Sequence, residues 1–274
     1  MTPIERLLVV PLGEDPERSA AAALKVELAP LGAAVGASGL GGSGLRAALE
    51  ATCSPFVLFA LPDQPVDAEG IATTLRGLEG APEAVLGSAG LVWRPAALSL
   101  DISTRERRRS GGSVHEGRRL ARLLALQAVL FPSWNGVVWR AAALGTDLPR
   151  RLDAEPLLAP APTDAEPLLA PAPTDAEPLA AGAFLASLAL EVLVRGSAWT
   201  GEHLAYSRRS AALVAGDVVA WGEALAMAEE LALLDQEGDF ERAVVNLTHE
   251  AKRAHLDRLL PVLDGAARRA AGRR

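Results

Sequence analysis

Short apolar runs alternate with amphipathic stretches over the first 93 residues, and this alternation restricts the possible folds more than any other feature of the sequence. The strongest signal is Phe56–Leu61, a continuous apolar run ended by a proline, which predicts a strand buried on both faces. Strands are also predicted at Leu7–Leu12, Gly32–Ser38 and Ala84–Trp93. Helical stretches separate these strands, which predicts an α/β fold with an open, mostly parallel, Rossmann-like sheet flanked by helices.

Further helices and strands extend this plan to the end of the chain. Helices are expected at Ala20–Leu28, Leu45–Ala51, Ala68–Leu78, Leu120–Leu130, Ala141–Leu144, Phe184–Val194, Asp217–Leu234 and Asp239–Leu260. Extended segments are expected at Asn135–Arg140 and Trp199–Tyr206. We therefore expect an α/β domain over residues 1–206 and a helical C-terminal extension over residues 207–274.

Residues 153–179 form an internal repeat. The sequence Asp-Ala-Glu-Pro-Leu-Leu-Ala-Pro-Ala-Pro-Thr stands at 153–163 and again at 164–174, and a partial copy follows at 175–179. Six prolines in the two full copies oppose a continuous helix or a central strand, so we expect an extended, solvated insertion in the α/β domain. Because the acids are duplicated with the repeat, we do not expect a catalytic role for any single copy.

Charge and composition exclude several kinds of partner. A net charge of −7 does not attract polyanions, and 11 aromatic residues (five Phe, five Trp, one Tyr) are too few for a base-stacking platform, so no nucleic acid is expected. The single cysteine, Cys53, allows no disulfide within the chain and fits a reducing compartment. The N-terminus does not resemble a signal peptide and no apolar run would span a membrane. We expect a soluble, cytoplasmic protein with at most peripheral membrane contact.

The end of the Phe56–Leu61 strand is the first candidate site, because ligands of open α/β sheets bind at the carboxyl ends of strands. Asp63 follows this strand and is a candidate ligand for a divalent cation, Mn²⁺ or Mg²⁺, that bridges nucleotide phosphates. Gln64 and Arg46 are assigned to the same nucleotide-binding side. The alternative for Asp63 is a turn-forming residue between two prolines.

Two other segments carry weaker signals. The glycine-rich run at 39–44 opens the helix that contains Arg46 and is either a phosphate cradle or a flexible turn. The arginine-rich segment 105–119 is either a solvated loop with a helix start or a mobile basic loop that contacts a phosphate. The four histidines show no zinc-binding spacing.

Several patches, in order along the chain, resemble family 2 glycosyltransferases. Residues 43–92 resemble the middle of that family, with the segments GLRAALEAT, PFVLFALPD, GIATTLRGL and EAVLGSAGLVW. The patch LFPSWNGVVWRAAAL at 130–144 looks like the acceptor-side strand, which implies acceptor-side roles for Trp134, Asn135 and Arg140. The segment AAGAFLASLALEVLVRGSAWTGEHLAYSRRS looks like the part of the family that runs from Glu-Asp to Tyr-x-Arg.

The tail DFERAVVNLTHEAKRAHLDRLLPVL resembles the C-terminal helices of glycosyltransferase-like domains that accompany teichoic-acid-type glycerophosphotransferases in actinobacteria. Taken together, the resemblance implies a GT-A fold, a nucleotide-sugar donor, a divalent cation and a role in cell-surface polysaccharide or glycoconjugate synthesis.

The acidic motifs of the family are reduced in this chain. At the Asp-x-Asp position, Asp63 is the one acid that remains. Ala180 and Ala181 replace the Glu-Asp pair, whose second acid is the expected general base, and alanine cannot accept a proton. The usual Asp pair that reads the nucleobase is missing around Gly36–Ser38. Either another acid, such as Asp67 or one in the repeat, substitutes, or the chain is a non-catalytic relative.

Three functions therefore stay open. The first is a glycosyltransferase, and the second is a non-catalytic GT-A subunit that binds a protein partner, or a second copy of itself, through the C-terminal helices. The third is a nucleotidyltransferase, because LPDQPVDAEGIATTL resembles the Asp-Gln-Pro segment of molybdenum-cofactor-type cytidylyltransferases and guanylyltransferases. Against the third, Gly13-Glu14-Asp15 follows the first strand, and acids there would repel a triphosphate.

Overall fold

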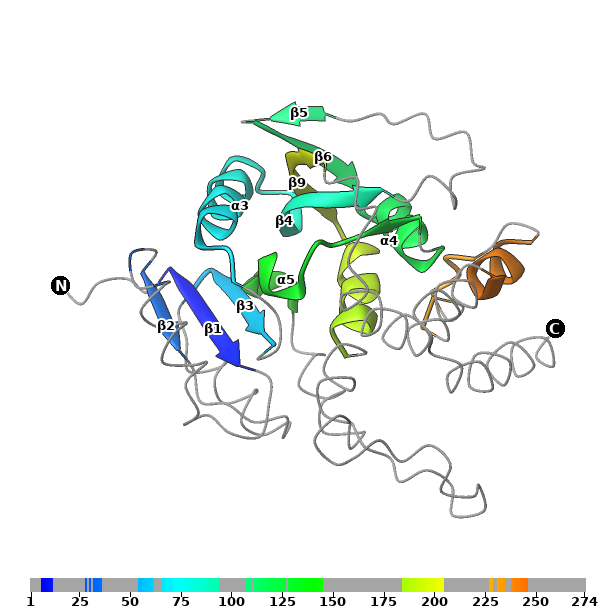
Figure 1. Cartoon of the computed structure of the whole chain (residues 1–274), viewed down its shortest axis with the longest axis horizontal. Helices are drawn as coiled ribbons and strands as arrows, with labels where there is room; N and C mark the ends of the chain where they lie inside the picture. Colours follow the sequence, from blue (N-terminus) through cyan, green and yellow to red (C-terminus); the bar gives the residue numbers. More distant parts are fainter. Residues whose placement is uncertain are drawn as a thin grey trace, which may run out of the picture.

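The computed structural model describes residues 6–11, 28, 30, 32–35, 54–61, 66–93, 107–109, 111–126, 128–144, 184–204, 227–228, 231–234 and 238–245. These residues form a nine-stranded sheet with helices packed on both faces (Figure 1). The α/β fold expected from the sequence is confirmed. The repeat at 153–179, the glycine-rich run at 39–44 and the predicted helix Leu45–Ala51 lie outside the described residues.

The sheet is mixed, and it is mostly parallel at its core. Its strands, in spatial order, are β2 (Ala33–Val35), β1 (Leu7–Pro11), β3 (Phe56–Ala60), β8 (Val137–Arg140), β4 (Ala84–Trp93), β9 (Ser197–Leu204), β6 (Gly112–Glu116) and β5 (Arg107–Arg109), and β7 (Val129–Leu130) pairs with β4. Strands β2, β1, β3, β4 and β9 run in one direction, whereas β8 lies antiparallel between β3 and β4. Thus the expected parallel arrangement holds for the strands that come from the apolar runs, and β8 interrupts it.

The helices are placed close to their expected positions. α3 (Ala68–Gly80) begins after Asp67, whose side chain accepts a hydrogen bond from the Gly70 N–H at 3.0 Å and caps the first turn. α5 (Ala141–Leu144) directly follows β8, and residues 184–193 are helical. These three helices confirm the sequence predictions for their segments.

Each face of the sheet buries a separate set of strand residues. In β1, Leu7 and Val9 belong to a hydrophobic cluster with α3, whereas Leu8 and Val10 belong to one with α4 (Gly117–Ala125) and the helix at 184–193. All four side chains are at most 4% exposed. A strand covered on both faces has no polar side to alternate with, which is why these strands read as continuous apolar runs.

The arginine-rich segment is in part a β-hairpin rather than a loop. Arg107–Arg109 pairs with Gly112–Glu116, and Gly111 turns the chain with φ of +77°, a conformation that glycine adopts without strain. α4 starts at Gly117 and ends at Ala125, so the predicted helix Leu120–Leu130 is displaced. The displacement arises because Val129–Leu130 leaves the helix to pair with β4.

Trp199 of β9 packs closely against α3 and β6. Its indole is fully buried, and it lies where side chains would otherwise project from Gly77 of α3 and Gly112 of β6. A Cβ atom would stand 2.1 Å from the indole at Gly77 and 2.4 Å at Gly112. The extended segment expected at Trp199–Tyr206 is therefore a central strand, and two glycines make room for it.

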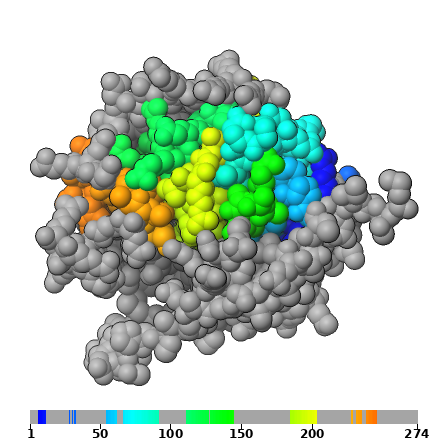
Figure 2. Space-filling model, turned by 180° about the vertical axis from the view of Figure 1, so that it is seen from behind, coloured from blue at the N-terminus to red at the C-terminus, as the bar shows by residue number. Residues whose placement is uncertain are grey.

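The described parts of the C-terminal region pack against the α/β sheet. Ala228, Leu233 and Phe240 share a hydrophobic cluster with α4 and the helix at 184–193, and Figure 2 shows the two regions adjoining. The predicted helix Asp217–Leu234 is not continuous, because residues 231–234 are non-helical and Ala232 has a φ of +50°. Residues 239–245 are helical, as expected for the start of Asp239–Leu260.

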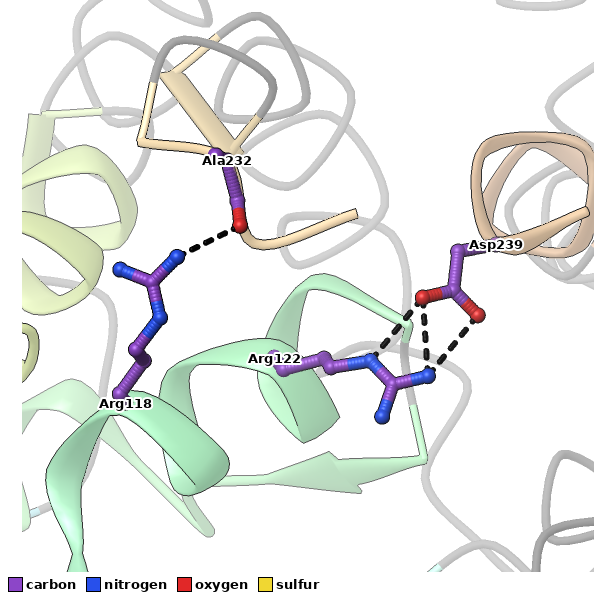
Figure 3. A network of polar contacts seen from close by, with 4 residues as sticks. All are labelled: Arg118, Arg122, Ala232 and Asp239. Atoms are coloured by element: carbon purple, nitrogen blue, oxygen red, sulfur yellow. Dashed lines mark hydrogen bonds and ion pairs between the residues drawn. The ribbon is translucent and has the colours of Figure 1, made fainter. Parts of the chain in front are cut away.

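Arginines of α4 hold this C-terminal region (Figure 3). Arg118 donates to the Ala232 carbonyl at 2.7 Å. Arg122 binds the fully buried Asp239 carboxylate through Nε at 3.0 Å and through a terminal nitrogen at 3.0 Å. A buried carboxylate needs such a paired, bidentate partner. The structure gives both arginines an internal contact, rather than the phosphate contact considered for the basic segment that contains Arg118.

Candidate functional site

The carboxyl ends of β1 and β3 lie side by side. Pro11, the last residue of β1, is in register with Ala60, the last residue of β3. The chain places β2 on one side of β1 and β3 on the other, so the strand order reverses at β1. Open α/β sheets bind ligands in the crevice outside such a reversal point. We call this part of the sheet, at Pro11 and Ala60, the carboxyl edge.

The residues expected to bind the nucleotide follow this edge in sequence. Asp63 and Gln64 come three and four residues after Ala60, and both lie outside the described residues, as does Arg46. Their roles as metal and nucleotide ligands stay predictions. Among the residues that the structure does describe, the nearest in sequence are Leu61, two residues before Asp63, and Val66, two residues after Gln64. The N–H and the carbonyl of Leu61 are held by two hydrogen bonds.

Asn135 makes both of these hydrogen bonds. Its side-chain Oδ1 accepts from the Leu61 N–H at 2.6 Å, and its Nδ2 donates to the Leu61 carbonyl at 2.8 Å. Asn135 is fully buried and belongs to η3 (Trp134–Gly136), a single 3₁₀ turn. Because β8 runs antiparallel to β3, the turn that precedes β8 falls at the carboxyl edge.

Trp134 lies in the same turn but points into the core. It is 4% exposed, and its ring centroid is 5.6 Å from that of Phe131. It is part of the hydrophobic cluster under α4. The structure therefore brings Trp134 and Asn135 together near the carboxyl edge, with Trp134 serving as packing for the turn.

Arg140 lies at the opposite edge of the sheet. It is in register with Phe56, the first residue of β3, and its guanidinium stands 5.4 Å from the centroid of the Phe56 ring. It donates to the carbonyl oxygens of Leu78 at 2.8 Å, Ala81 at 3.2 Å and Ala84 at 2.9 Å. The three residues expected on the acceptor side are thus separated, and Arg140 instead holds the end of α3.

Burial lowers the pKa of Arg140 from its ordinary value, while the negative charge of Glu83 acts in the opposite direction. Two of the three carbonyl oxygens around the guanidinium also accept backbone hydrogen bonds, Leu78 from the Ala81 N–H and Ala81 from the Ala84 N–H, so Arg140 uses their second acceptor position. A permanent cation there complements the negative end of the α3 dipole. The position of Arg140 is thus explained by the fold alone.

The described residues do not by themselves form a metal site. They contain no group of three or more His, Cys, Asp or Glu side chains that could hold a metal ion. Asp67, considered as a substitute for the missing acids, is occupied as the cap of α3.

The sequence resemblance implied an acceptor-side role for Asn135, but the sequence did not reveal its contact with main chain. The missed partner is the main chain of Leu61, which is 74 residues away and carries no side-chain signal. A local signal did exist, because Ser133 accepts a hydrogen bond from the Asn135 N–H at 3.1 Å. A serine two residues before an asparagine, after a proline, is typical of a tight turn.

Comparison with known proteins finds no matching family model, no matching curated protein and no matching solved structure. Within the described ranges, no helix has both the length and the apolar character needed to cross a membrane.

Proposed function

We propose that this chain is a GT-A-fold, glycosyltransferase-like protein that binds a nucleotide-sugar donor at the carboxyl edge of β1 and β3. The observation that carries the proposal is the placement of Leu61. It directly follows the last residue of β3, beside the reversal of strand order, and Asn135 binds its N–H and its carbonyl. The proposed process is sugar transfer in cell-surface polysaccharide or glycoconjugate synthesis.

The donor side of the proposal follows from general chemistry. The diphosphate of a nucleotide sugar is anionic, so a site for it needs a bridging cation or N–H donors. In the proposal, Asp63 contacts the cation and Gln64 and Arg46 lie on the nucleotide side. Turnover would also need a general base, which Ala180 and Ala181 do not supply. Nucleotide binding is therefore the first property to measure.

The test is calorimetric titration of the purified chain with UDP, CDP, GDP and their sugar conjugates, each with Mn²⁺ or Mg²⁺. We expect metal-dependent binding of one nucleoside diphosphate, which Asp63→Asn weakens at least about tenfold by removing a charged ligand. Asp67→Asn is the matched control, because asparagine also caps helices and this carboxylate is already bound to α3. Equal binding by wild type and Asp63→Asn would contradict the role of Asp63.

The second candidate is a non-catalytic subunit of the same fold. The replacement of the expected base by Ala180 and Ala181 favours it. Such a subunit would bind none of the nucleotides at millimolar concentration, so the same titration separates the two candidates. A chain that binds nucleotide but transfers no sugar would keep the donor site and lose the enzymatic part of the proposal.

A further inference from the structure

We infer that Asn135 is a positioning residue for the carboxyl edge: it holds the N–H and the carbonyl of Leu61 and thereby sets where the chain enters the segment that carries Asp63. The inference rests on the proposed function, since it assigns a role within that site. It goes beyond the expected acceptor-side role, because Asn135 contacts main chain rather than ligand.

The need for such a residue arises from how the sheet ends. The pairing of β3 with β8 stops at Leu58 and Val138, and the pairing of β3 with β1 stops at Ala60 and Pro11. Leu61 therefore lies one residue beyond the ladder with β1 and three residues beyond the ladder with β8, and it is only 3% exposed. The N–H and the carbonyl of a buried residue in this position need partners.

The Asn135 amide suits this task because it presents one acceptor and one donor side by side. It pairs with Leu61 as a neighbouring strand would, at 2.6 and 2.8 Å. Aspartate of the same shape lacks the donor, and serine is too short to span both groups. The choice of asparagine is thus explained by the two bonds to the N–H and the carbonyl of one residue.

The turn that carries Asn135 is itself held in place. The Ser133 hydroxyl accepts a hydrogen bond from the Asn135 N–H, and the Gly136 N–H donates to the Ser133 carbonyl at 3.2 Å. The neighbouring Trp134 is buried against Phe131. These contacts hold the turn without involving Leu61. Asn135 is therefore positioned by its own turn, and Leu61 is positioned by Asn135.

The experiment compares Asn135→Ser and Asn135→Asp with wild type in the full chain. Amide hydrogen exchange at Leu61 reports the contact, and titration with UDP, CDP and GDP, each with Mn²⁺, reports the site. We expect Asn135→Ser to speed Leu61 exchange and to raise the Kd of the bound nucleotide, each by at least about tenfold beyond the global change in stability. Asp239→Asn is the control, because it weakens a buried contact beside α4 and leaves the carboxyl edge intact.

Asn135→Asp adds a readout that general destabilisation does not give. The introduced carboxylate faces the Leu61 carbonyl and cannot donate to it, but the protonated form can. We therefore expect its Kd, relative to wild type at the same pH, to approach the wild-type value as the pH is lowered.

The outcomes separate this inference from the proposed function. If wild type binds a nucleotide and both Asn135 variants bind it equally well, Asn135 only stabilises the fold and the inference is overturned while the proposed function stands. The same holds if Asp239→Asn loses as much affinity as Asn135→Ser. If wild type itself binds none of the three nucleotides, the proposed function fails and the inference fails with it.

Discussion

The two ends of the short segment η3–β8 hold main-chain groups at opposite edges of the sheet, and they do so with different chemistry. At the carboxyl edge, Asn135 both accepts from and donates to one residue, Leu61. At the other edge, Arg140 donates to three carbonyl oxygens at and after the end of α3. The comparison teaches that the side chain matches the backbone it meets: an amide for a strand-like peptide, and a pure donor for a helix end.

The largest expected effect breaks the Asn135 end. Asn135→Ala leaves the buried N–H and carbonyl of Leu61 without partners, so we expect the free energy of unfolding to fall by about 3 kcal/mol. Urea denaturation measures it. A loss below about 1 kcal/mol would mean that water replaces the amide as the partner of the Leu61 N–H and carbonyl.

Next in size is the Arg140 end. Arg140→Met keeps much of the aliphatic stem but removes three hydrogen bonds at a half-buried position, and we expect a loss of about 2 kcal/mol. Hydrogen exchange should accelerate in the last turn of α3. Arg76→Met, at an exposed arginine of the same helix, is the control. Equal acceleration in both variants would count against a specific role for Arg140.

A smaller effect sharpens the comparison through pH. In Asn135→Asp, burial and the facing Leu61 carbonyl raise the pKa of the introduced carboxyl, so its destabilising effect is present above that raised pKa and is relieved as the pH falls below it. We expect the stability difference from wild type to shrink by about 1 kcal/mol between about pH 8 and about pH 5. Denaturation of both proteins across this range measures it, and a difference that stays constant contradicts the assigned donor role of Nδ2.

The smallest effect concerns Glu83, whose charge acts on Arg140. Because Glu83 is exposed, we expect Glu83→Gln to change the stability by less than about 0.5 kcal/mol, and added salt should remove the change. Thermal denaturation at low and high salt measures it. A larger, salt-independent loss would show that Glu83 holds Arg140 by a direct structural contact.

Much of the fold could be predicted from the sequence where burial leaves a local pattern. The continuous apolar runs at Leu7–Leu12 and Phe56–Leu61 predicted β1 and β3 to within one residue, and Ala84–Trp93 matches β4. The β5–β6 hairpin was missed because its arginines read as solvent-exposed loop. The direction of β8 was also missed, since strand pairing depends on residues far apart in the chain rather than on local periodicity.

At the candidate site, the end of β3 was predictable from the sequence, but the contact that holds Leu61 was not. The rule that ligands bind at carboxyl ends pointed to the residues after Leu61, and the structure confirms that β3 ends there beside β1. The contact from Asn135 crosses 74 residues and recognises only main-chain atoms, so no side-chain pattern at Leu61 announces it. Arg140 also binds main-chain atoms far away in the sequence, but it does so at the opposite edge of the sheet.

Recognition of main chain alone also bears on how this protein tolerates change. Asn135 reads the peptide of residue 61 and not its side chain, so the attachment survives replacement of the side chains that follow, provided the backbone path is kept. At the carboxyl edge, the sheet therefore holds the start of the following segment through main-chain atoms, so segments of different sequence can be joined there. Under the proposed function, the stretch after Leu61 is the segment to exchange in a search for altered donor specificity, because the sheet itself need not be redesigned.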